Sequence, residues 1–138
     1  MNHYTFEEIE IGHKESFTVT VTDKMRDKFR EITGDVNPLH NDPVYAASKG
    51  HDGCVVYGMM TAAFLSTLAG VYLPGEHSLI HEVETKFRKP VYIGDTLVVE
   101  GEVTGKNETF SILEIKAVIT NQDGVRVLKA KMKVAAEG

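Results

Sequence analysis

Hydrophobic and polar positions alternate in several segments of the chain, and this pattern predicts β-strands. The clearest early case is residues 17–22, where Phe and two Val alternate with Thr. Asp123 and Gly124 lie between two later alternating runs and predict a hairpin turn. The second half of the chain therefore predicts antiparallel strands at about residues 79–89, 95–105, 109–121 and 125–135.

Helical spacing of apolar residues predicts a first helix over about residues 23–33. Met25, Phe29 and Ile32 fall on one face of this helix, and Gly34 suits its C-terminal end. A loop over residues 35–43 follows, rich in turn-forming residues. A short helix then runs to about residue 49, with a proline at its first position.

A third helix, residues 58–73, is apolar almost all round. A helix of that kind belongs in the interior of a protein. Its length approaches the roughly 20 residues of a membrane span, but Gly58, Thr61, Ser66 and Gly70 interrupt the apolar run. We therefore expect a buried helix and no membrane span.

Helices early in the chain and strands later predict an α+β fold. The 138 residues suit one domain, 1–138, and the 25% of charged residues is ordinary for a globular protein. The net charge of −5, without a basic block, excludes a typical nucleic-acid-binding protein. A single cysteine and the absence of a signal-peptide pattern predict a cytoplasmic protein.

Asp35 and His40 are the candidate catalytic pair. Pro38 restricts its own backbone and that of Asn37, which lowers the entropy cost of holding the two side chains together. A carboxylate and an imidazole around one water make an acid–base pair. The spacing alone also allows each residue simply to satisfy backbone groups at neighbouring helix ends.

The segment around this pair resembles the hydratase motif of MaoC-like dehydratases and (R)-specific enoyl-CoA hydratases. The motif has the form Gly-Asp-x-Asn-Pro-x-His, and further similar segments follow in the same order. These segments lie at residues 32–43, 45–47, 56–60, 73–75 and 87–95, so the similarity extends from residue 32 to residue 95. The resemblance implies the hotdog fold, in which a curled antiparallel β-sheet wraps around a long central helix, here residues 58–73.

The resemblance implies a reversible syn addition of water to a trans-2-enoyl-CoA, giving a (3R)-hydroxyacyl-CoA. Asp35 and His40 would hold the water and manage the proton at Cα. Asn37 would orient this pair, or would only stabilise the turn. The implied partners are the enoyl-CoA or 3-hydroxyacyl-CoA substrate and a second copy of the chain, as a homodimer or a higher homo-oligomer. No cofactor is implied.

Gly58 matches the glycine whose backbone N–H binds the thioester carbonyl in the family. A free N–H in the first turn of a helix lacks an intrahelical acceptor and lies at the positive end of the dipole. It therefore suits an enolate oxygen. Ser66 resembles a serine near the family's catalytic pair, and it has two alternatives, a bond to water or Asp35 and a bond to the carbonyl of Ala62.

One position departs from the family. Tyr57 stands where His usually precedes the Gly-Met pair, and this difference bears on the substrate rather than on the reaction. His51 and Asp52 alone do not make a metal site, so no metal is expected. Arg88 and Lys89 are the candidates for contact with CoA, with a solvated strand end as the alternative.

Two other functions remain open at this stage. The hotdog fold also hosts thioesterases, and fold alone does not decide function. A non-catalytic acyl-thioester binding module is the third possibility, against which the intact Asp35 and His40 pair argues. The acyl chain length, the carrier and the pathway are not readable from the sequence.

Overall fold

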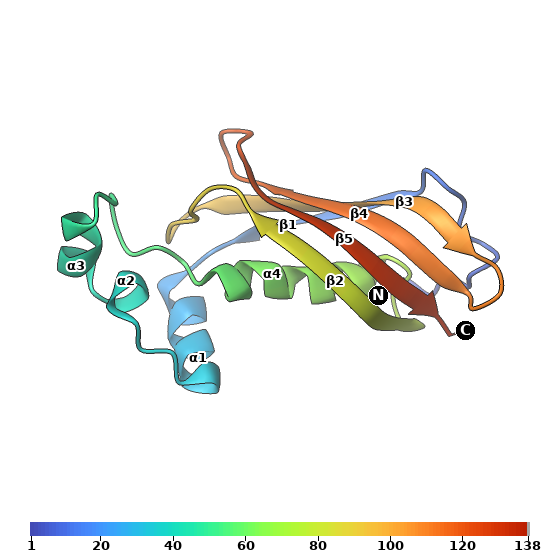
Figure 1. Ribbon diagram of the computed structural model, residues 1–138, viewed down its shortest axis with the longest axis horizontal. Coiled ribbons are helices and arrows are strands. Elements are labelled where there is room, and N and C mark those ends of the chain that lie inside the picture. Colours follow the sequence, from blue (N-terminus) through green and yellow to red (C-terminus); the bar gives the residue numbers. More distant parts are fainter. Residues whose placement is uncertain (138) are drawn as a thin grey trace.

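Five antiparallel strands form one sheet with a helix along one face (Figure 1). The computed structural model describes residues 1–137. The strand order is β1-β3-β4-β5-β2, with β1 and β2 at the edges. The strands are β1 (Lys14–Thr20), β2 (Ser78–Phe87), β3 (Thr96–Asn107), β4 (Ile112–Thr120) and β5 (Arg126–Ala136). The predicted α+β class and the four later strands are confirmed.

The first strand ends earlier than the sequence pattern indicated. Strand β1 stops at Thr20, and Thr22 instead caps helix α1 (Asp23–Thr33) by accepting a hydrogen bond from the Met25 N–H at 3.2 Å. Thr22 cannot continue the strand pairing while it serves as this cap, because the N-cap residue already belongs to the helix end. The chain therefore turns from the sheet into α1 at this point.

The core lies between the inner face of the sheet and helix α4 (Gly58–Thr67) with its continuation η1 (Leu68–Tyr72). Gly101 of β3 allows this close approach, since a Cβ there would lie 2.8 Å from Leu68 Cδ2. Leu65 and Leu68 are fully buried. The last turn of the predicted helix has π geometry, and the helix ends at Tyr72, one residue before the predicted end.

One stripe of the central helix is open to solvent, which corrects the expectation that the whole helix is enclosed. Met59 is 67% exposed, and Ala63 and Ser66 on the same side of α4 are also exposed. A single sheet covers only one side of a helix, so the opposite apolar side needs another cover. Within residues 1–137, no helix is long and apolar enough to cross a membrane.

Three short helices lie at the N-terminal end of α4, beyond the sheet (Figure 1). They are α1, α2 (Pro38–Asn41) and α3 (Pro43–Ser48). The sequence pattern indicated only a loop where α2 forms. Ile32 was expected on the buried face of α1 but is 82% exposed. Only the earlier turns of α1, with Met25 and Phe29, reach the core.

Candidate active site

The loop that carries Asp35 is stabilised by hydrogen bonds between residues two positions apart in the sequence. The Asp35 carboxylate accepts a hydrogen bond from the Asn37 N–H at 3.0 Å, and the Asn37 side-chain oxygen accepts one from the Leu39 N–H at 2.9 Å. Pro38 then takes the first position of α2, where a missing N–H costs nothing. These local contacts explain why the Asp-x-Asn-Pro-x-His order makes α2 and brings His40 into its last turn.

His40 is fixed by the segment that leads into α4. Its Nδ1 lies 2.6 Å from the Val55 carbonyl oxygen, and the Val55 N–H donates to the Leu39 carbonyl at 3.1 Å. A carbonyl oxygen only accepts, so Nδ1 carries the proton. In the neutral ring, Nε2 is then an acceptor and is the nitrogen left for a ligand.

A cavity of about 290 Å³ brings His40 and Gly58 together. Its walls also come from the next turn of α4, from the end of β2 and from the segment after β2, with Thr61, Phe87, Arg88, Lys89 and Pro90 among them. A larger hollow of about 440 Å³ lies on the outer face of the sheet, among three Glu and three Lys. The smaller cavity is the candidate active site because two of the predicted site residues, His40 and Gly58, line it.

Gly58 begins α4 and presents a free amide. Its N-cap residue, Tyr57, makes no side-chain cap, and no acceptor for the Gly58 N–H is present among residues 1–137. The first amides of a helix carry the positive end of its dipole, so this N–H suits a developing negative charge. A Cβ at Gly58 would lie 3.1 Å from Phe87 Cε1, and this close packing favours glycine.

Tyr57 links the two halves of the site. The residue is only 2% exposed, and its hydroxyl donates to the backbone carbonyl of Asp35 and accepts from Asn41 Nδ2 at 3.0 Å. Arg30 holds the Asn41 side-chain oxygen at 2.7 Å. The Tyr57 ring packs on the His40 ring with centroids 4.2 Å apart. Tyr57 therefore fixes both catalytic candidates from one position.

Removal of this hydroxyl is expected to disturb catalysis more than folding. In Tyr57→Phe the ring still packs against His40, but the contacts to Asp35 and Asn41 are lost. We expect kcat to fall at least roughly tenfold, because two hydrogen bonds are lost and one alone contributes about 0.5–1.5 kcal/mol net. The control is Tyr4→Phe, which removes a tyrosine hydroxyl bonded to Glu15 at 3.0 Å. Equal kcat values for the two variants in steady-state assays would contradict a positioning role.

The other predicted site residues lie outside the cavity of this single chain. Asp35 is exposed and does not line the cavity, although Tyr57 connects its backbone to the wall. Asn37 caps α2 and so performs the turn-stabilising role. Ser66 lies on the exposed stripe of α4, and within residues 1–137 its hydroxyl bonds neither to Asp35 nor to the carbonyl of Ala62. The catalytic roles of these residues stay predictions.

Thr61 is a cavity residue that the sequence did not single out as functional. It is 3% exposed, and its hydroxyl has no hydrogen-bond partner among residues 1–137. A buried hydroxyl without a partner costs about 1–3 kcal/mol. The signal in the sequence was a polar residue one turn after Gly58 in an otherwise apolar helix. The Thr61 hydroxyl is thus available to a bound molecule or to a water.

Comparison with known proteins identifies the family of this chain. The family model described as MaoC like domain matches residues 6–124. The (R)-specific enoyl-CoA hydratase of Aeromonas caviae is 36% identical over 96 residues, which cover 70% of this chain and 72% of the relative. That of Rhodospirillum rubrum is 34% identical over 103 residues, covering 75% of this chain and 71% of the relative.

Solved structures show the same architecture. An unliganded R-hydratase from Pseudomonas aeruginosa superposes with a TM-score of 0.91 at 29% identity, covering 96% of this chain and 84% of that one. The sheet curled over a central helix is therefore the hotdog fold. The chain belongs to the MaoC-like family.

Proposed function

We propose that this protein is an (R)-specific enoyl-CoA hydratase, which in reverse is a 3-hydroxyacyl-CoA dehydratase. It adds water reversibly to a trans-2-enoyl-CoA with syn geometry and forms the (3R)-hydroxyacyl-CoA. The observation that carries the proposal is one cavity lined by both His40, whose Nε2 is left as the acceptor, and Gly58, whose N–H has no acceptor among residues 1–137. Curated relatives named as enoyl-CoA hydratases and as a 3-hydroxybutyryl-CoA dehydratase support it.

Syn addition fits a single imidazole that takes and returns one proton. The Nε2 atom of His40 accepts a proton from water while the hydroxide oxygen bonds to Cβ. The C=C electrons move toward the thioester oxygen, where the Gly58 N–H stabilises the negative charge. The imidazolium then gives the same proton to Cα on the same face. Asp35 is expected to hold the water and to stabilise the imidazolium charge.

Hydration of crotonyl-CoA tests the proposal directly. The purified protein is expected to bleach the enoyl-thioester absorbance, and an (R)-specific 3-hydroxyacyl-CoA dehydrogenase is expected to oxidise the product. Release of free CoA thiol from saturated acyl-CoA, with no bleaching, would indicate a thioesterase instead. Binding of acyl-CoA without any turnover would indicate a binding module and would overturn the proposed reaction.

The same proposal includes a homodimer. The open stripe of α4 contains the exposed Met59, and strand β2 is an unpaired sheet edge whose Val83 is 44% exposed. Helix α4 contacts β2, so the open stripe and the free edge are neighbours. Pairing of two β2 edges would cover both, because an unpaired apolar edge favours association with a second strand. Ser66 would then lie inside the assembly.

A charge at this edge is expected to separate the subunits. Val83→Arg should give a particle with the mass of one chain, 15.3 kDa, in light scattering after gel filtration. Val98→Arg is the control, since Val98 is similarly exposed, at 37%, but lies on β3 inside the sheet. A parent protein that is already monomeric would refute the dimer.

The cytoplasm is the compartment that we propose. Cys54, the single cysteine of the sequence, is a free thiol, which is in keeping with a reducing compartment. The proposed substrate, a CoA thioester, is consistent with the same compartment.

Residues 1–137 contain no group of three His, Cys, Asp or Glu side chains arranged to hold a metal.

A further inference from the structure

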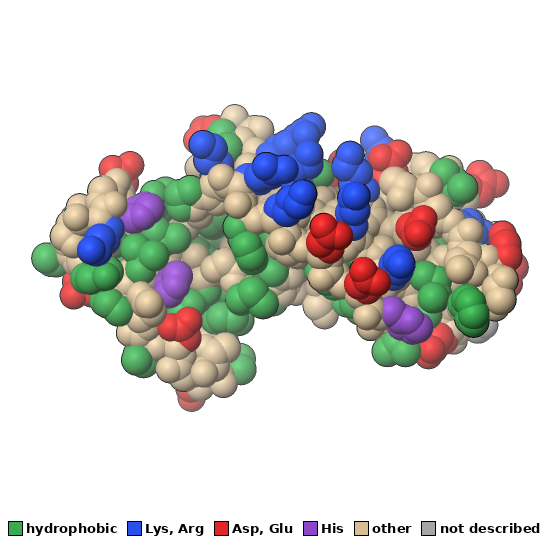
Figure 2. Space-filling model, viewed as in Figure 1, with side chains coloured by type: hydrophobic (Ala, Val, Ile, Leu, Met, Phe, Trp, Pro, Cys, Tyr) green, Lys and Arg blue, Asp and Glu red, His purple; other side chains and the backbone are tan. Residues whose placement is uncertain are grey.

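Basic side chains gather on the outer face of the sheet, although the whole chain is acidic. Figure 2 shows Lys and Arg grouped over the sheet in this region. They surround a shallow cavity of about 170 Å³ formed by β2, the residue that follows β2, β4 and β5. We define the basic patch as the five cations that line this cavity: Lys86, Arg88, Lys116, Lys129 and Lys131.

Strand register brings these cations together. Lys86 of β2 pairs with Lys129 of β5, and Lys131 of β5 pairs with Lys116 of β4. Neighbouring strands lie about 4.8 Å apart, so the patch crosses the sheet within about 10 Å. Such a spacing of like charges is unfavourable without an anion between them.

Most of this positive charge is unpaired. No carboxylate lies within salt-bridge distance of the five side chains among residues 1–137, although Glu84 also lines the cavity. The neighbouring positive charges of Arg126 first, and then of Lys116, lower the pKa of Lys129. These like charges therefore disfavour the proton on Lys129, and an anion between them would relieve the repulsion.

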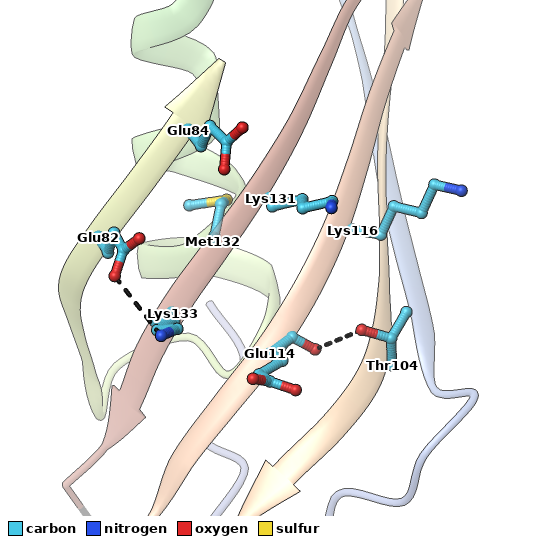
Figure 3. A pocket seen from close by; sticks show the side chains of 8 residues that line it. All are labelled: Glu82, Glu84, Thr104, Glu114, Lys116, Lys131, Met132 and Lys133. Atoms are coloured by element: carbon cyan, nitrogen blue, oxygen red, sulfur yellow. Dashed lines mark hydrogen bonds and ion pairs between the residues drawn. The ribbon is translucent and has the colours of Figure 1, made fainter. Parts of the chain in front are cut away.

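In the adjacent hollow on the same face of the sheet, by contrast, a lysine is paired with a carboxylate. Figure 3 shows Glu82 directed at Lys133, and the two groups form an ion pair at 3.6 Å. Lys133 lies two residues from Lys131 on β5 and points to the same side of the sheet. Lys133 is paired directly with Glu82, whereas Lys131 lies opposite Glu84 of β2 in the strand register but forms no ion pair with it among residues 1–137. This distinction separates the basic patch from ordinary surface lysines.

Arg88 joins the basic patch to the candidate active site, because it lines both cavities. The N–H groups of Arg88 and Lys89 donate to the Val127 carbonyl at 2.8 and 3.3 Å, which fixes this segment against the start of β5. A ligand that leaves the cavity beside Arg88 therefore reaches the basic patch. The patch faces away from α4, so the dimer proposed above leaves it open.

We propose that the basic patch binds the phosphoryl groups of the CoA nucleotide. The inference rests on the proposed function, which places the thioester between His40 and Gly58. The pantetheine arm separates the thioester from the diphosphate and the 3′-phosphate, so these anions contact the protein outside the cavity. Five cations, of which Arg88 also lines the active-site cavity, match this cluster of phosphates, and Lys and Arg are the usual ligands of phosphate oxygens.

The size of the patch favours a nucleotide over an acidic carrier protein. A stable protein interface buries about 800 Å² on each partner, whereas the unpaired cations here lie on three neighbouring strands within about 10 Å of one another across the sheet. Glu82 and Glu114 line the next hollow along the sheet, and there they would repel an acidic protein surface. The charge complementarity is therefore confined to an area that a few phosphates fill.

Two thioesters that differ only in the carrier test this inference. Crotonyl-CoA carries the phosphates, and crotonyl-N-acetylcysteamine lacks them. In the double variant Lys129→Gln/Lys131→Gln, we expect KM for crotonyl-CoA to rise about tenfold. The ratio of kcat/KM for the CoA thioester to that for the truncated thioester falls by the same factor. Lys133→Gln, on the same strand and face, is expected to keep this ratio.

Other outcomes would overturn the inference in distinguishable ways. An equal loss for both thioesters would mean that the lysines act on the fold or on the chemistry and not on phosphate. A loss confined to a crotonyl thioester of acyl carrier protein would identify an acidic protein as the partner. If the parent enzyme hydrates neither thioester, the proposed function fails, independently of the basic patch.

Discussion

Loss of either member of the acid–base pair is expected to lower kcat for crotonyl-CoA hydration by roughly 10²–10⁴-fold. In Asp35→Asn, the side-chain oxygen still accepts the hydrogen bond that the Asn37 N–H now donates at 3.0 Å. In His40→Asn, the amide nitrogen takes the place of Nδ1 and still donates to the Val55 carbonyl. Both variants therefore keep the hydrogen bonds that shape the loop. They remove only the carboxylate of Asp35 or the Nε2 of His40.

The two substitutions are also expected to be strongly non-additive. When two groups act together on one water, removal of either group already abolishes most of their joint contribution to kcat. The double variant is therefore expected to have a kcat only slightly below that of the slower single variant. The control is Asp42→Asn, which keeps the cap of α3 through its side-chain oxygen. A kcat for Asp35→Asn close to that of this control would confine Asp35 to a structural role.

The sequence predicted the elements that depend on near neighbours. Asp42 and Pro43 begin α3 as expected, and Gly34 ends α1 in the left-handed conformation with a φ of 72°. Each of these features is decided within four residues of chain. The hairpin at Asp123 and Gly124 forms for the same reason, and it joins β4 to β5.

The parts of the site that the sequence did not predict depend on distant contacts. Tyr57 was noted only as a departure from the family. Its role as a link depends on Asn41, 16 residues away, and on Asp35, 22 residues away. The basic patch likewise needs the register of β2, β4 and β5, because Lys86 and Lys129 are neighbours only in the paired sheet. Alternation of residue types predicts strands but not their partners.

The exposed face of α4 has a related cause. Hydrophobic periodicity indicates that a helix needs cover, but it does not say whether the cover belongs to the same chain. The sheet covers the side with Leu65, and Met59 on the other side remains open. A chain with one sheet covers only one side of such a helix. When the helix is apolar on all sides, we therefore expect a second chain to cover the other side.

The amide of Gly58 can be removed without removal of the helix. Proline has no N–H and is well tolerated at the first position of a helix. The preceding residue, Tyr57, has φ −52° and ψ 122°, which a following proline also favours. Gly58→Pro therefore removes the proposed enolate donor, puts the ring Cδ in its place and keeps a residue suited to the start of the helix. Gly58→Ala is its matched control, because it adds a Cβ against Phe87 but keeps the N–H.

We expect kcat of Gly58→Pro to lie about 10²–10³-fold below that of Gly58→Ala, as for the loss of one donor from other oxyanion holes. Both variants add a Cβ against the Phe87 ring, so this part of the crowding cancels in the ratio. Circular dichroism and thermal unfolding check that α4 is intact in each. If the two variants have equal kcat, the enolate is held by another donor, and the free N–H of Met59 becomes the next group to remove.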